Sequence, residues 1–300
     1  MKPIISVVIP TYNRAESLLD LLQTLQGQSL PNSDYEVIVV SDGSTDGTAR
    51  VVRAMQRIMT NLAFFEQANS GPAAARNNGV LQAKGKFIAF TDDDCLASRD
   101  WLKEIVKTLE TKPIIGIQGK TTTYKEEKTP LTHQIENHFG HPALPTCNAA
   151  FHKWAFQAVG GFDTSFPFAH NEDADLAWRI QALGEISFEP SVHIIHPPRK
   201  EAFSKLAKRM RILESEFLLF YKNQKLYQTH RTSSPWVTIY KEVFLIHLFR
   251  HLKSHFKYVA RPRLFFQGVA LNVVWWISLI KLFPKFRKAE LKYQSHYKSS

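Results

Sequence analysis

The amino-acid sequence predicts an α/β fold: a Rossmann-like sheet flanked by helices, followed by a mostly α-helical, basic C-terminal region. Two observations support this prediction. In the first two hundred residues, apolar runs of strand length alternate with segments of helical periodicity, which is typical of a parallel sheet with crossover helices. Residues 1–199 hold 18 basic and 22 acidic residues, whereas residues 200–300 hold 20 basic and 5 acidic ones. We therefore expect two domains, divided after residue 199.

The strands of the predicted sheet are apolar runs bounded by turn residues. The first four are Ile4–Ile9, Tyr35–Val40, Leu62–Glu66 and Lys86–Thr91. After residue 110 the alternation loosens, and we expect Thr121–Pro145 to be a longer, irregular segment. Ser191–His196 is strand-like again.

The helices are predicted from apolar residues at three- and four-residue spacing. These residues are Leu18, Leu19, Leu22 and Leu25 in the first helix, and Val51, Val52, Met55 and Ile58 in the second. Asn13 and Glu16 would begin the first helix as a capping pair. Pro72 fits the first turn of the third helix, where an amide donor is not needed. A fourth helix, Trp101–Glu110, would begin at Ser98.

Composition excludes several classes of protein. With 300 residues, of which 44% are hydrophobic, the chain can bury a sizeable core and is neither disordered nor a disulfide-stapled mini-protein. Its two cysteines, Cys95 and Cys147, fit a reducing compartment and are too few for a structural zinc site built on thiolates. The N-terminal run Ile4–Ile9 has the length of a strand and falls well short of a signal peptide.

Polar residues follow the predicted strands at the point where each strand ends. They are Pro10-Thr11-Tyr12-Asn13, Asp42, Asn69-Ser70-Gly71 and Asp92-Asp93-Asp94. In open α/β sheets, ligands bind beyond the carboxyl ends of the strands. The three adjacent carboxylates repel one another, so a bound cation would compensate them, and oxygen donors suit Mg²⁺ or Mn²⁺. The alternative is a solvated acidic turn that caps the next helix.

Six motifs occur in the same order as in the family 2 glycosyltransferases of the GT-A fold. They are Val7–Arg14, Ser41–Asp46, Gly71–Asn77, Asp92–Asp94, Gly160–Asp163 and Glu172–Leu176. Between Ile4 and His196 the chain closely resembles this family. The resemblance implies a mixed GT-A sheet and the transfer of a sugar from a nucleotide-diphospho-sugar, with inversion at the anomeric carbon. It favours a UDP-sugar as donor and a divalent metal, Mn²⁺ or Mg²⁺, as cofactor.

The resemblance also implies roles for individual residues. The residues that it places around the donor are Pro10, Thr11, Tyr12, Asp42, Arg76, Asp92 and Asp93. Asp94 would ligate the metal together with Asp92, and His196 would complete the site. Asp173, paired with Glu172, matches the base that removes the acceptor proton, because a sugar hydroxyl is a poor nucleophile until it is deprotonated.

Each assignment has a purely structural alternative. Asp42 could serve the backbone of its own turn, and Arg76 could be an exposed helix charge. Glu172 and Asp173 could only complement the dipole at a helix N-terminus. His196 could be a packing residue, as many lone histidines are.

Missing motifs disfavour other enzyme classes. The chain lacks the P-loop, the G-x-G-x-x-G fingerprint and the G-x-S-x-G elbow. It also lacks the Q-x-x-R-W signature of processive family members, which favours addition of one sugar per encounter. The expected acceptor is a glycan or a lipid-linked hydroxyl in cell-surface polysaccharide synthesis. A polyprenyl-phosphate sugar synthase and a non-catalytic binding protein of the same fold stay open as alternatives.

The basic C-terminal region contains a nineteen-residue, mostly apolar stretch, Phe265–Phe283, with basic residues on both sides. Its length is at the lower limit for a membrane span, and its polar residues count against one. A basic helix with aromatic residues such as Trp275 and Trp276 fits an anionic membrane surface, which predicts peripheral attachment to the cytoplasmic side. Packing on the main domain or a homodimer contact is the alternative. Nucleic acid is disfavoured, because no recognition module is apparent.

Overall fold

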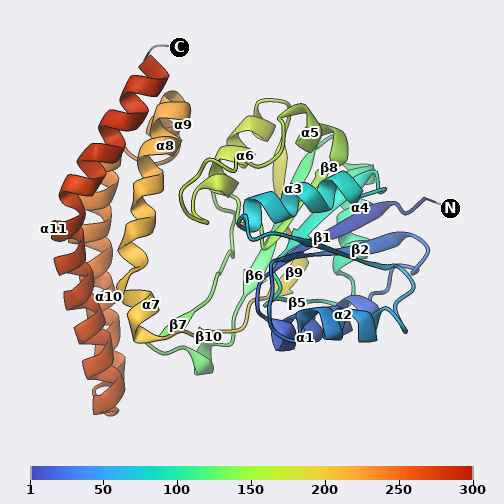
Figure 1. Ribbon diagram of the computed structural model, residues 1–300, viewed down its shortest axis with the longest axis horizontal. Helices are drawn as coiled ribbons and strands as arrows, with labels where there is room; N and C mark the ends of the chain where they lie inside the picture. The colour runs from blue at the N-terminus through green and yellow to red at the C-terminus, as the bar shows by residue number, and fades with distance from the viewer. Residues whose placement is uncertain (1, 299–300) are drawn as a thin grey trace. The chain divides into compact units, whose positions relative to one another are not determined.

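The computed structural model describes residues 2–298, which divide into two compact units (Figure 1). Within the described residues, the first unit comprises 2–124, Gln134–Thr164 and Glu172–Pro197, and the second comprises Lys125–His133, Ser165–Asn171 and 198–298. Two short internal segments therefore belong with the C-terminal residues. The functional division after residue 199 stays a prediction.

The first unit is built on an eight-stranded sheet with the order β3-β2-β1-β4-β8-β6-β9-β5. Its strands are β1 (Ile5–Thr11), β2 (Tyr35–Asp42), β3 (Leu62–Gln67), β4 (Phe87–Thr91), β5 (Leu96–Ala97), β6 (Gly116–Thr122), β8 (Asn148–His152) and β9 (Ile186–Ile195). The first four strands pair in parallel, as the alternation predicted. Strand β8 runs antiparallel to both of its neighbours, and β5 runs antiparallel to β9. The mixed sheet that the family resemblance implied is therefore confirmed.

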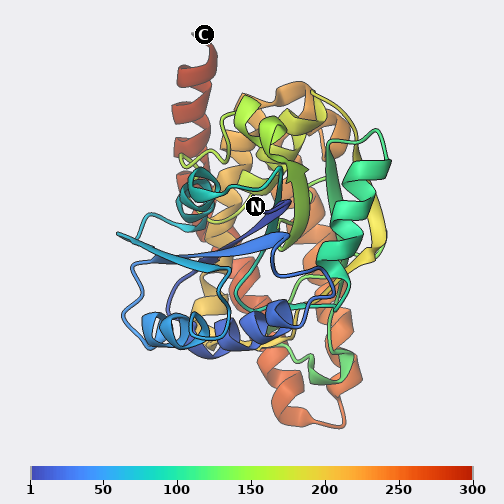
Figure 2. The same cartoon turned by 90° about the vertical axis from the view of Figure 1, so that its right-hand side faces the viewer.

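Helices cover both faces of this sheet. They are α1 (Ala15–Gln26), α2 (Thr48–Met55), α3 (Pro72–Gln82), α4 (Trp101–Thr111), α5 (Lys153–Ala158) and α6 (Glu172–Gln181). In Figure 2, α1 and α2 lie on one face and α3 on the other. Of the predicted apolar face of α1, Leu18, Leu22 and Leu25 are fully buried, whereas Leu19 is only partly buried against the core. Helix α3 packs closely on β1, because a Cβ atom at Gly79 would come within 2.4 Å of a Val8 methyl carbon.

Three expectations about helix ends are wrong. Asn13 does not cap α1: Arg14 occupies the N-cap position, and the Asn13 side-chain oxygen accepts a backbone N–H of the loop after β2 at 2.7 Å. Asp100, rather than Ser98, is the N-cap of α4. Ile58 lies beyond the end of α2 and is 59% exposed. The physical reason at Asn13 is a tertiary partner, which local spacing does not reveal.

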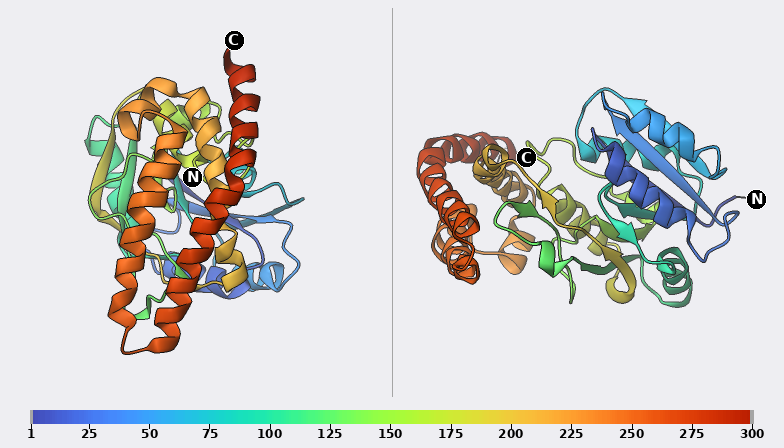
Figure 3. Two further views of the ribbon diagram at one scale, coloured as in Figure 1. Left: turned by 90° about the vertical axis from the view of Figure 1, so that its left-hand side faces the viewer. Right: turned by 90° about the horizontal axis from the view of Figure 1, so that it is seen from below.

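Helices make up most of the second unit. They are α7 (Phe203–Ala207), η2 (Arg209–Glu214), α8 (Ser215–Lys222), α9 (Gln224–His230), the π-helix η3 (Val237–His247), α10 (Leu248–Ser254), η4 (His255–Tyr258) and α11 (Pro262–Lys298). The internal segments contribute the 3₁₀-helix η1 (Lys125–Glu127) and β7 (Thr132–His133), which pairs with β10 (Arg199–Lys200). Helices α10 and α11 lie side by side (Figure 3).

A buried polar network holds the second unit together around Glu216, whose residue surface is 1% exposed. Its carboxylate accepts hydrogen bonds from Arg231 at 2.6 Å, from the Tyr227 hydroxyl at 2.7 Å and from the Asn171 amide at 3.0 Å. Burial by itself raises the pKa of Glu216, but the charge of Arg231 and the hydrogen bonds from His170 and Asn171 lower it to about 2. The ionised carboxylate is therefore part of the folded structure.

We expect the second unit to lose stability as the pH falls from about 4.5, the ordinary pKa of this group, towards about 2. Because folding lowers the pKa of Glu216, its contribution is fully present above the unfolded pKa and disappears as the folded carboxylate is protonated. A shift of this size corresponds to about 3 kcal/mol. Acid titration followed by tryptophan fluorescence will measure the loss. Glu216→Gln should be less stable at neutral pH and should flatten the acid dependence in this window; an unchanged acid dependence would contradict the assignment.

Candidate active site

Asp42 ends β2 and connects it to the loop that leads into α3. Its Oδ1 accepts hydrogen bonds from the Gln67 amide at 2.9 Å and from the Ser70 backbone N–H at 2.8 Å. Its Oδ2 accepts the Gly71 backbone N–H at 2.8 Å, and Gly71 has a φ of 89°. Asp42 thus shapes this loop rather than its own turn. A carboxylate oxygen can accept a second hydrogen bond, so Oδ2 keeps capacity for a ligand, and the nucleobase role stays a prediction.

The residues at the end of β1 differ in exposure. Pro10 and Thr11 pair with β2 and are buried, whereas Tyr12 follows the strand and is 49% exposed. Tyr12 therefore presents an aromatic surface at the carboxyl edge of the sheet. The contact of Pro10, Thr11 and Tyr12 with a nucleobase stays a prediction.

Arg76 brings three of the sequence motifs together. It lies on α3 and is 5% exposed, so it is not the exposed helix charge that the sequence left open. Its Nη2 lies 2.7 Å from Asp92 Oδ1, its Nη1 lies 3.9 Å from Glu172 Oε1, and its guanidinium carbon lies 5.5 Å from the centre of the Phe162 ring. Burial alone lowers the pKa of Arg76, but Asp92 and Glu172 raise it. Arg76 is thus a buried cation that holds two carboxylates in one place.

The loop that carries Phe162 is clamped to α3. The Asn77 amide donates to the Phe162 carbonyl at 2.8 Å, and its Oδ1 accepts the Phe162 backbone N–H at 2.9 Å. Gly161 has a φ of 73°, and a Cβ atom there would lie 2.6 Å from Asn77 Oδ1. Only glycine fits this position, which explains its place in the motif.

The three aspartates after β4 turn towards different partners. Asp92 contacts Arg76, whereas Asp93 and Asp94 both contact Arg14, at 2.7 and 3.1 Å. Burial raises the pKa of Asp93 to about 6, although Arg14 opposes this rise. Burial also raises the pKa of Asp92, but Arg76 and His196 lower it below its ordinary value. Arg14 belongs to the Val7–Arg14 motif, but the sequence did not indicate a role for it. The signal that could have revealed one is a basic residue in the short loop between β1 and α1.

Glu172 and Asp173 form the first turn of α6 and differ in burial. Glu172 is 6% exposed, and burial together with the neighbouring Asp173 raises its pKa to about 7. Asp173 is only partly buried, and its Oδ1 accepts the backbone N–H of the next residue at 2.9 Å. Within residues 2–298, Glu172 Oε2 and Arg76 Nε are buried without a hydrogen-bond partner. Orphaned polar atoms of this kind point to a site that a ligand completes.

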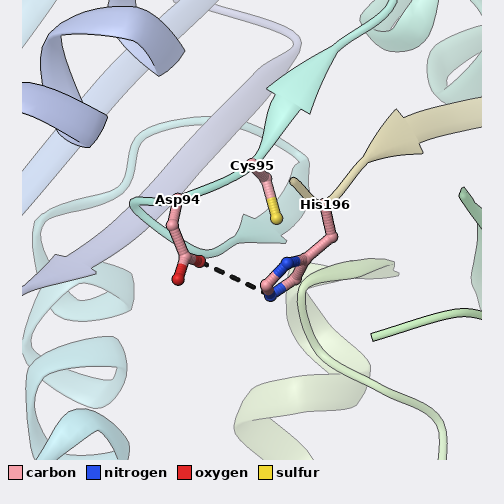
Figure 4. Close-up of side chains that lie close together, drawn as sticks. All are labelled: Asp94, Cys95 and His196. Carbon is pink, nitrogen blue, oxygen red and sulfur yellow. Dashed lines mark ion pairs between the residues drawn. The ribbon is translucent and has the colours of Figure 1, made fainter. Parts of the chain in front are cut away.

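His196, which follows β9, lies beside the aspartates and is 2% exposed. Its Nε2 lies 3.6 Å from Asp94 Oδ1, while His193 instead contacts the Thr122 hydroxyl at 2.8 Å. The ligand atoms of Asp94, Cys95 and His196 all lie within 4.8 Å of one another (Figure 4). This donor set fits a divalent metal ion. Asp92, which bonds to Arg76, stays a predicted ligand, and Cys95 is a donor that sequence reasoning missed.

Comparisons with known proteins identify the family to which this chain belongs. The family model "Glycosyl transferase family 2" matches residues 6–167, which is more than half of the chain. Glycosyltransferase AglE of Haloferax volcanii is 41% identical over 108 residues, which is 36% of this chain and 36% of that protein. The chain spans about half or less of the length of the first curated relatives that it matches.

Two solved structures share the fold. The Staphylococcus aureus TarS fragment 1–349 in complex with UDP is 20% identical, with a TM-score of 0.58 over 95% of this chain and 92% of that one. The mannosyltransferase PcManGT from Pyrobaculum calidifontis, in complex with GDP-Man and Mn²⁺, is 20% identical, with a TM-score of 0.61 over 98% of this chain and 84% of that one. With its six motifs, its mixed sheet and the family match over residues 6–167, this chain belongs to the family 2 glycosyltransferases.

Proposed function

We propose that this chain transfers one sugar per encounter from a nucleotide-diphospho-sugar, a UDP-sugar, to a hydroxyl of a glycan or lipid-linked acceptor. The transfer inverts the configuration at the anomeric carbon and uses Mn²⁺ or Mg²⁺. The product belongs to cell-surface polysaccharide synthesis. The observation that carries the proposal is the convergence of Arg76, Asp92 and Glu172, with Asp94 and His196 beside them. The solved relatives support it, since TarS is in complex with UDP and PcManGT is in complex with GDP-Man and Mn²⁺.

On the donor side, Asp94 and His196 would hold the metal ion. When bound, the ion would neutralise negative charge on the diphosphate leaving group. Arg14 lies against Asp93 and Asp94 and keeps these carboxylates together against their mutual repulsion. Arg76 does the same for Asp92 and Glu172, so that the donor site is already shaped before the substrate arrives.

On the acceptor side, Asp173 would be the base. It is the more exposed member of the pair, whereas Glu172 is buried with Oε1 towards Arg76. The acceptor hydroxyl would pass its proton to the Asp173 carboxylate as the new glycosidic bond forms. Glu172 would act by positioning Arg76, whose Nη1 lies 3.9 Å from Glu172 Oε1.

A panel of sugar nucleotides tests the donor assignment. In the presence of Mn²⁺, we expect a UDP-sugar at about 100 times its Kd to stabilise the protein by about 2.7 kcal/mol, which is roughly 5 °C in Tm. GDP- and dTDP-sugars at the same concentration serve as the comparison ligands. Release of UDP with an acceptor present distinguishes an enzyme from a non-catalytic binding protein. A larger shift with a GDP-sugar would overturn the choice of UDP.

We also propose that the second unit attaches the chain to the cytoplasmic face of an anionic membrane. By length and composition alone, α11 could cross a membrane. Several large apolar side chains along η3, α10, η4 and α11 are at least half exposed, namely Leu245, Phe249, Phe256, Phe266, Ile280 and Phe283. Basic residues are interspersed with them, at Arg250, Lys253, Lys257, Arg263 and Lys281. An apolar and basic helical surface of this kind suits the interface of an anionic bilayer.

Vesicle sedimentation tests the attachment. We expect binding to phosphatidylcholine vesicles that contain phosphatidylglycerol, and weaker binding without the anionic lipid or at high salt. The double variant Phe256→Asp/Phe266→Asp should bind at least roughly tenfold more weakly, because each exposed ring no longer enters the interface. Phe139→Asp, at a 92% exposed phenylalanine of the first unit, is the matched control. Equal partitioning of the double variant and the control would refute attachment through this surface. Light scattering tests the alternative, in which the same surface forms a homodimer.

A further inference from the structure

Cys95 lies beside the two residues that we propose to hold the metal ion. Its Sγ and the nearest ligand atoms of Asp94 and His196 lie within 4.8 Å of one another, and Figure 4 shows the sulfur on the side where the carboxylate and the imidazole face each other. Cys95 and His196 are almost fully buried, at 0% and 2% exposed. The three donors therefore belong to one enclosed cluster.

The pairing of two strands keeps this cluster in place. Strand β5 runs antiparallel to β9, with Leu96 opposite Ile195. Cys95 directly precedes this pair on one strand, and His196 directly follows it on the other. The Cys95 backbone N–H donates to the Asp92 carbonyl at 3.2 Å, and the His196 backbone N–H donates to the Thr122 carbonyl at 2.8 Å. The positions of the sulfur and the imidazole are thus set by backbone hydrogen bonds at both ends.

The chemistry of these donors differs from that of a magnesium site. Mg²⁺ takes oxygen ligands almost exclusively, whereas thiolate and imidazole ligands suit transition-metal ions such as Co²⁺ and Zn²⁺. A set of three protein ligands also leaves coordination positions open for a substrate, as in catalytic zinc sites. A site with oxygen, nitrogen and sulfur donors would therefore bind ions with a high affinity for sulfur more tightly than Mg²⁺.

We infer that Cys95 is a third protein ligand of the active-site metal ion, so that this site takes thiophilic transition-metal ions in preference to Mg²⁺. The inference rests on the proposed function, which places a metal ion at Asp94 and His196. On binding, the S–H bond breaks, a sulfur–metal bond forms, and the proton leaves to solvent. The alternative is that Cys95 only fills space, as buried cysteines often do.

Cobalt spectroscopy of the full chain tests this inference, because a thiolate bound to Co²⁺ has an intense near-ultraviolet charge-transfer band that oxygen and nitrogen ligands lack. We expect this band when Co²⁺ is added to the wild-type protein, and we expect Zn²⁺, but not an equal amount of Mg²⁺, to abolish it. Cys95→Ser should lose the band and bind Zn²⁺ at least roughly tenfold more weakly in calorimetry. Cys147→Ser, at the buried cysteine whose side chain contacts Cys95, should keep the band, because the donor cluster consists of Asp94, Cys95 and His196.

Three outcomes would overturn the inference. Co²⁺ could bind without the charge-transfer band. The metal would then be held by Asp94 and His196 without Cys95 as a ligand, and the proposed function would stand. The band could survive in Cys95→Ser and vanish in Cys147→Ser, which would assign the sulfur to the other cysteine. Co²⁺ could also fail to bind at all, which would remove the metal from the proposed function as well. Circular dichroism and the Tm of each variant show whether it is folded, and Cys95→Ala replaces the serine variant if that one is not.

Discussion

Replacing Asp94 by Asn is expected to lower the rate of sugar transfer by roughly a thousandfold. The substitution keeps the shape of the side chain but removes its charge, so that the diphosphate leaving group loses the metal ion that would neutralise it. Asp94 also faces Arg14 at 3.1 Å and His196 at 3.6 Å, and both contacts weaken without the carboxylate. The measurement is UDP release per minute with Mn²⁺ and acceptor present, together with Mn²⁺ binding by calorimetry.

Asp20→Asn provides a matched control, because Asp20 is an exposed aspartate on α1. It should keep the wild-type rate and the wild-type affinity for Mn²⁺. Treatment of the wild-type enzyme with EDTA should reproduce the loss, and added Mn²⁺ should restore the activity. An Asp94→Asn variant that transfers sugar within tenfold of the wild-type rate would contradict the role of this aspartate.

Replacing Asp173 by Asn should separate binding from catalysis. Without a base, the acceptor hydroxyl keeps its proton, so we expect the transfer rate to fall by roughly a hundredfold to ten-thousandfold. The Kd for the donor should change much less than the rate, because Asp173 is more exposed than Glu172, whose Oε1 lies 3.9 Å from Arg76 Nη1. Single-turnover transfer and donor binding by calorimetry measure the two quantities.

Glu172→Gln distinguishes the two members of the acidic pair. Glu172 is buried against Arg76, so its loss of charge should weaken donor binding as well as slow the reaction. If Asp173→Asn transfers sugar at a near-normal rate and Glu172→Gln does not, the base is Glu172. A phosphate acceptor needs no base, so independence from both carboxylates would favour the polyprenyl-phosphate sugar synthase.

Much of the first unit could be predicted from local patterns. The strand runs beginning near Ile4, Tyr35 and Leu62 appear within one or two residues of their predicted bounds, and Pro72 opens α3 as expected. Asp175 and Arg179, four residues apart on α6, form an ion pair at 2.6 Å, a contact that local helical spacing accounts for.

The second half of the sheet could not be predicted in the same way. Strands β6 and β8 are rich in small and polar residues, such as Gly116, Gln118 and Asn148, and they lack the apolar runs that identify the first four strands. Their burial comes from pairing with β4 and β9, not from their own composition. Strand propensity is a weak signal when neighbouring strands decide what fits.

The sequence by itself determined the alternation of strands and helices, the family, and the polar residues that follow the strand ends, because apolar periodicity and motif order can be read along the chain. Only the tertiary structure decided which of these residues meet. Arg14 reaches the aspartates after β4, and Cys95 comes to lie beside His196, because parallel β1 and β4 share an edge and the short strand β5 pairs with β9. Contacts between residues so far apart in sequence depend on strand order and register, which leave no periodic trace in the residues themselves.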